Sequence, residues 1–152
     1  MRRLTFTVLL LAPVVGLAFA YGAGPDEVVT ALKTHFESAR PEDRPDLGIR
    51  IAQQQLRNAD KLYGSGDADQ ARAAVDDIVT YSEKARDAAI LTKKHLKNIE
   101  IDVRKMADKL RDIKRTLAFD DQAPVEQAIR RLEDVRTTLL KEMFAKDKKE
   151  TK

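Results

Sequence analysis

A seven-residue repeat of apolar and small side chains runs through the centre of the chain, from residue 67 to residue 117, with no glycine or proline inside it. Two interleaved sets make up the repeat: Val75, Ser82, Ala89, Leu96, Val103, Leu110 and Leu117 in one, and Ala71, Ile78, Ala85, Thr92, Ile99, Met106 and Ile113 in the other. Their alternate spacing of three and four residues is the pattern by which a helix presents one seam to a partner helix. The pattern therefore predicts a single helix over 67–117, about 75 Å long at about 1.5 Å per residue.

The seam changes character in its middle. Its side chains are bulky near both ends but small or polar from Ser82 to Thr92. Small residues allow close approach of a partner, or mark the gap between two packed regions. We expect two lobes on this spine, one packing residues 47–63 against 67–81 and one packing a last helix against 96–117.

Local signals place the other helices at about 26–39, 46–63 and 122–145. Glycines at 64 and 66 close the second helix, and Asp67 with Gln70 forms a start resembling a capping box. The link before the last helix is short, which predicts an antiparallel C-terminal hairpin. The expected fold is thus an all-α bundle of about four helices in one domain, 21–145, followed by a disordered basic tail, 146–152.

The first twenty residues, 1–20, have the features of a secretory signal peptide. Arg2 and Arg3 precede an apolar run, which ends in Ala18-Phe19-Ala20. We expect cleavage near Ala20 and export to the periplasm or the exterior; the alternative is a retained membrane anchor. Removal of 1–20 takes away two arginines and no acidic residue, so the formal charge falls from +3 to +1.

One stretch, 52–80, resembles a single tetratricopeptide-type helical hairpin. The resemblance rests on Gly66-Asp67-x-x-x-Ala71, with Ala59 and Tyr63 before it and Val75 and Ile78 after it. It implies two antiparallel helices joined by a tight turn. Glu83 stands where that family has a helix-ending proline, and no second copy is detectable in the sequence.

No catalytic or cofactor-binding pattern emerges from the residues. The chain has no cysteine and only two histidines, His35 and His95, neither of which follows a glutamate by three residues as in di-iron bundles. It also lacks a Gly-x-Ser-x-Gly turn and a phosphate-binding glycine loop. We therefore expect no enzyme activity, no cofactor and no metal.

Charge is uneven along the predicted spine, at −3 over 67–90 and +5 over 91–115. This distribution has two readings, an ordinary solvated face or a basic surface that meets an anionic envelope component such as lipid head groups. Nucleic acid is not an expected partner of an exported chain. The candidate interaction surface combines the small residues with nearby cations: Ser82, Ala85, Ala89, Thr92, Lys93, Lys97 and Arg104.

These features together predict a binding or scaffolding protein of the cell envelope, acting through a protein partner or through self-association along the long helix. Two alternatives stay open. One is a periplasmic helical chaperone, and the other is a carrier of a small ligand held near 82–92.

Overall fold

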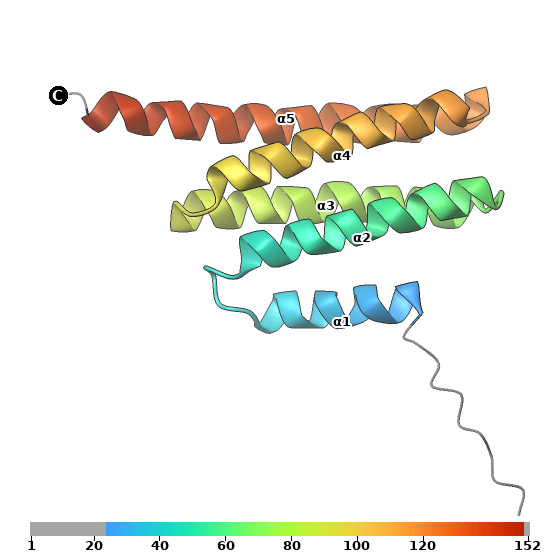
Figure 1. Cartoon of the computed structure of the whole chain (residues 1–152), viewed down its shortest axis with the longest axis horizontal. Coiled ribbons are helices and arrows are strands. Elements are labelled where there is room, and N and C mark those ends of the chain that lie inside the picture. Colours follow the sequence, from blue (N-terminus) through green and yellow to red (C-terminus); the bar gives the residue numbers. More distant parts are fainter. Residues whose placement is uncertain (1–23, 151–152) are drawn as a thin grey trace, which may run out of the picture.

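The computed structural model describes residues 24–150, and all of its regular structure is helical. Figure 1 shows the five helices running alternately in opposite directions. Their bounds are Pro25–Ser38 (α1), Arg44–Gly64 (α2), Ala68–Thr92 (α3), Leu96–Thr116 (α4) and Phe119–Glu150 (α5). The described part of the chain contains no strand, so the all-α prediction is confirmed.

The prediction of one helix over 67–117 is wrong. The chain leaves the helix at Thr92 and starts a new one at Leu96, and both Lys93 and His95 adopt left-handed backbone conformations, with φ of 57° and 63°. No glycine or proline marks this break. The reason for it is tertiary: the reversal lays α4 against α2 and α3, and lets α5 pack on α3 as well as on α4.

Ion pairs between helices show how the two hairpins, α2–α3 and α4–α5, are stacked. Asp46 pairs with His95 at 3.2 Å and Asp60 with Lys109 at 2.9 Å, which joins α2 to α4. Arg72 pairs with Asp121 and Lys93 with Glu142, which joins α3 to α5. Each pair links residues 49 positions apart. The second hairpin therefore lies on the first in a parallel register.

The core consists of the stripes that the helices turn toward one another. The repeat positions in α3 and α4 are buried apart from half-buried Thr92, and Leu117 after α4 is partly buried against the core. One acidic side chain, Glu100, is also buried, and Arg136 of α5 donates a hydrogen bond of 2.6 Å to it. This charged hydrogen bond satisfies the buried carboxylate and helps to set the register of α4 and α5.

Helix α1 packs on α2 and reaches α3 through side chains. Phe36 meets Tyr81 edge to face at 5.5 Å between ring centroids. Lys33 donates to Asp77, which also accepts a hydrogen bond from buried Gln55. A chain of polar contacts thus joins three helices and keeps the buried amide paired.

The C-terminal end of the chain differs from the prediction, and the N-terminal end lies outside the described residues. Helix α5 continues to Glu150, past the expected end at residue 145, because the lysine-rich segment that follows contains no helix breaker. The predicted signal peptide, 1–20, lies outside the described residues. No helix within 24–150 is long and apolar enough to cross a membrane.

Gly48 of α2 lies in close contact with the backbone of α3. A Cβ atom placed there would lie 2.9 Å from the Tyr81 carbonyl oxygen and 3.0 Å from the Ala85 Cβ. Because the first of these atoms is backbone, the helices would have to move apart to admit a methyl group. The small residues of α3 thus serve contact within the chain.

We expect Gly48→Ala to lower the free energy of unfolding by about 1–2 kcal/mol, because the overlap outweighs the better helix propensity of alanine. Urea denaturation monitored by circular dichroism measures this change. Gly64→Ala is the matched control, since nothing lies within 4 Å of its Cβ position. Equal effects of the two substitutions would contradict the close crossing.

The break between α3 and α4 yields a second prediction, in which glycine substitutions at two adjacent residues change the free energy of unfolding in opposite directions. Lys93→Gly is expected to raise the free energy of unfolding by up to about 1 kcal/mol, because glycine adopts the left-handed conformation without steric cost. This gain exceeds the small loss of the partly exposed Lys93–Glu142 ion pair. Lys94 has no positive φ, so Lys94→Gly is expected to lower it by about 0.5–1 kcal/mol through unfolded-state entropy. A stabilised Lys94→Gly or a destabilised Lys93→Gly, measured in urea, would contradict the observed turn.

Candidate binding surface

The small residues predicted to form an interaction surface lie inside the protein. Ser82, Ala85 and Ala89 are 0% exposed. The Ser82 hydroxyl donates to the Ile78 carbonyl at 2.7 Å, and α2 crosses over Ala85 at Gly48. These side chains therefore face neighbouring helices of the same chain, not a free surface.

The other four predicted residues lie around the start of α4 and along it. Thr92 is half-buried and donates to the Ala88 carbonyl at 2.8 Å. Lys93, Lys97 and Arg104 are exposed, and Lys93 pairs with Glu142. The structure thus separates the cations of the predicted surface from its small residues.

The fold separates charge by helix. Helix α2 carries four cations and two acids, a net of +2, and α4 carries seven cations and four acids, a net of +3. The net charges of α1, α3 and α5 are −2, −2 and −1, counting histidine as neutral. Because α2 lies beside α4 in parallel register, the two positive helices form one layer of the molecule.

Seven exposed cations of α2, α4 and the turn before α4 have no acidic partner among the side chains described for residues 24–145. We call this set the cationic face: Arg50, Arg57, Lys61, Lys94, Lys97, Arg104 and Lys105. Arg50 and Arg57 lie two turns apart on α2, as do Lys97 and Arg104 on α4, so each pair follows one stripe of its helix.

The acids of the same two helices are mostly occupied elsewhere. Asp46 pairs with His95, and Asp60 pairs with Lys109. Two pairs lie within α4 itself, Asp108 with Arg111 and Asp112 with Arg115. Glu100 is buried under α5. Asp102 alone has no cation partner within the described residues, which leaves the cationic face with a surplus of positive charge.

Contacts between α4 and α5 use the remaining cations of α4. Arg111 donates to Glu133 at 2.6 Å, and this hydrogen bond raises the pKa of Arg111. Lys114 donates to Glu126, and chiefly through this hydrogen bond the pKa of Glu126 lies below its usual value. These pairs join α4 to α5 and leave Arg111 and Lys114 outside the set of unpaired cations.

The Glu126 contact predicts a titration. Removing the ammonium group by Lys114→Met is expected to raise the pKa of Glu126 toward its ordinary 4.5, observed in the side-chain carboxyl resonance by NMR. A depressed folded-state pKa contributes stability above the unfolded-state pKa, and this contribution is lost as pH falls through the folded value. Lys105→Met is the control; an equal shift there, or no shift with Lys114→Met, would contradict the pairing.

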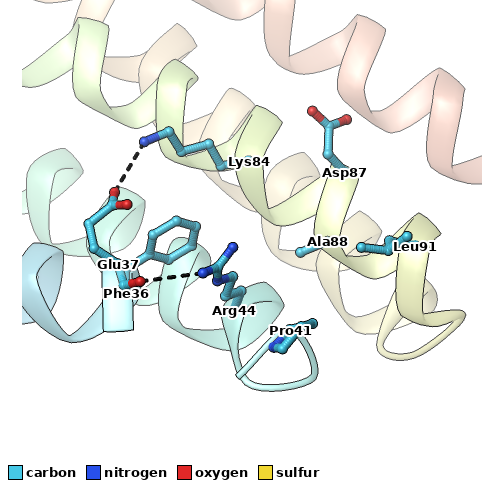
Figure 2. Close-up of a pocket in the computed structure, with 8 residues that line it drawn as sticks. All are labelled: Phe36, Glu37, Pro41, Arg44, Lys84, Asp87, Ala88 and Leu91. Carbon is cyan, nitrogen blue, oxygen red and sulfur yellow. Dashed lines mark hydrogen bonds and ion pairs between the residues drawn. The ribbon is translucent and has the colours of Figure 1, made fainter. Parts of the chain in front are cut away.

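A separate hollow of about 360 Å³ lies where α1 ends and α3 continues. Figure 2 shows Phe36, Arg44 and Lys84 on one side of it, with Ala88 and Leu91 of α3 on the other. Leu91 is 76% exposed, whereas Phe36 is buried. The hollow thus combines apolar side chains with two cations, Arg44 and Lys84, and two acids, Glu37 and Asp87.

Within residues 24–150, no group of three or more His, Asp or Glu side chains is arranged to hold a metal ion. The two histidines lie far apart in the sequence, and His95 contacts Asp46.

Comparison of the chain with protein-family models, with curated proteins and with solved structures found no match.

Proposed function

We propose that this chain is an exported helical binding protein that docks on an anionic surface of the cell envelope through its cationic face. The observation that carries the proposal is the set of seven exposed cations on α2, α4 and the turn between α3 and α4 that have no acidic partner among the described side chains. The expected signal peptide supplies the location. The proposed bound surface is a bilayer containing anionic phospholipids.

Elementary electrostatics supports this partner. A basic residue near an anionic membrane surface contributes about 1 kcal/mol, so several cations on one face together give useful affinity. The same charges without such a surface repel each other and are stabilised only by solvent and salt. In this proposal the bundle, with its repeat-patterned seam, is a rigid support that holds two parallel rows of cations.

A chaperone role receives less support from the surface. Large exposed apolar side chains in the described region are Val28, Leu91, Phe119 and Phe144. They lie on three different helices, and the two phenylalanines lie near opposite ends of α5. A client-binding surface needs a contiguous apolar patch.

The proposal predicts binding to vesicles that contain anionic lipid but not to neutral vesicles, for protein beginning at Tyr21. The double variant Lys97→Glu/Arg104→Glu is expected to weaken binding by about thirtyfold or more, from the loss of about 1 kcal/mol per cation. Vesicle sedimentation at low ionic strength measures the affinity, and added salt is expected to weaken it through screening.

The matched control is Arg130→Glu/Lys141→Glu, which changes the net charge equally on exposed positions of α5. It is expected to bind nearly as the unmodified protein does. Similar weakening by both double variants would show a net-charge effect and no cationic face. Equal binding to neutral vesicles would refute the electrostatic proposal.

A further inference from the structure

The hollow beside α1 has a chemical character distinct from that of the cationic face. Helix α1 has 14 residues and α3 has 25, so the last turns of α3 extend beyond the end of α1. Ala88 and Leu91 lie on that uncovered part, and Pro41 of the α1–α2 link lines the hollow with them. These three side chains form an apolar floor that no other element of the described chain covers.

Two cations flank this floor beside the Phe36 ring. The Lys84 ammonium lies 5.5 Å from the ring centroid, and the Arg44 guanidinium carbon lies 5.9 Å from it (Figure 2). Both are within the range of cation–π attraction to Phe36, and the Lys84 ammonium lies closer still to the Tyr81 ring, at 4.9 Å from its centroid. The site therefore offers two positive groups to a ligand whose apolar part rests on Leu91.

The present partners of these cations leave donors for a ligand. Arg44 donates to the carbonyl oxygens of Ala39 and Glu37, at 3.2 and 3.3 Å, which occupies two of the five N–H groups of a guanidinium. The Lys84 ammonium lies 3.5 Å from the Glu37 carboxylate, and both side chains are well exposed. Such an exposed and long ion pair is weak, so another carboxylate can replace Glu37 at little cost.

The second acid of the hollow, Asp87, already has a cationic partner. Asp87 pairs with Arg86 at 2.8 Å, so it opposes an incoming anion only weakly. The volume, about 360 Å³, lies within the range of small-molecule sites. A ligand that suits these features has a short apolar body and one negative head.

We infer that this hollow binds a free aliphatic monocarboxylate, with the carboxylate between Lys84 and Arg44 and the alkyl chain on Pro41, Ala88 and Leu91. An uncharged alcohol of the same length lacks the attraction to the two cations, and an alkylammonium is repelled by them. This inference is independent of membrane docking, because none of its residues belongs to the cationic face.

Octanoate is the probe for the experiment, with 1-octanol and octylammonium as comparison ligands. Titrated into the purified chain below micelle-forming concentrations, octanoate is expected to give saturable shifts of the amide resonances of Ala88, Leu91 and Arg44 in NMR spectra. Weaker binding of octanol and of octylammonium is expected. Equal binding of the three ligands, or shifts that do not saturate, would overturn the assignment.

Two variants test the head and the tail of the site separately. Lys84→Met keeps the aliphatic stem and is expected to weaken octanoate binding about fivefold, with little effect on octanol. Leu91→Ala removes an exposed side chain, so the fold is retained, and it is expected to weaken both ligands about threefold. Lys61→Met and Phe144→Ala are the controls for charge and apolar area elsewhere. Unchanged affinity in Lys84→Met and Leu91→Ala, or equal losses in the controls, would refute the site.

Discussion

The turn at Lys93–His95 is the constraint on which the rest of the structure depends. The helices on either side of this turn, α3 and α4, run antiparallel because the chain reverses there. The left-handed conformation costs about 1–2 kcal/mol at each of the two residues that adopt it. Burial of each large apolar side chain contributes about 1.5–3 kcal/mol, and α4 alone buries six of them; these are Leu96, Ile99, Val103, Met106, Leu110 and Ile113. The packing gain therefore outweighs the cost of the turn, and His95 adds a contact to Asp46 that fastens the turn to α2.

The same turn produces the charge separation. It brings α4 beside α2 in parallel register, so two helices of positive net charge share one layer, while α1, α3 and α5 carry negative net charge. Along the sequence these charges alternate by helix, and the stacking of the two hairpins places the two positive helices side by side. The hollow beside Phe36 has another origin, the shortness of α1 relative to α3. The proposed surface docking and the proposed ligand binding thus rest on separate features of the molecule.

Local signals were sufficient for the helices and for several of their ends. Composition and repeat spacing predicted an all-α chain, and the Asp67 cap is present, with its side chain accepting from the Gln70 N–H. The break at 93–95 carries no comparable signal, since neither glycine nor proline stands there and seven-residue spacing continues across it; a half-buried Thr92 and a histidine are the only hints. Ala85 lies against Gly48, 37 residues earlier in the chain, and the ion pairs that join α2 to α4 link residues 49 apart. These contacts between helices follow from tertiary packing, which a repeat in the sequence of one segment does not specify.

Distance measurement across the turn tests this account most directly. The chain has no cysteine, so spin labels attached to Thr80→Cys on α3 and Asp108→Cys on α4, both at exposed positions, report on one pair only. Double electron–electron resonance is expected to give a distance of about 15–30 Å for helices that fold back on each other. A distance of about 42 Å, the length of 28 residues at about 1.5 Å each, would show a continuous helix and contradict the reversal on which the cationic face depends.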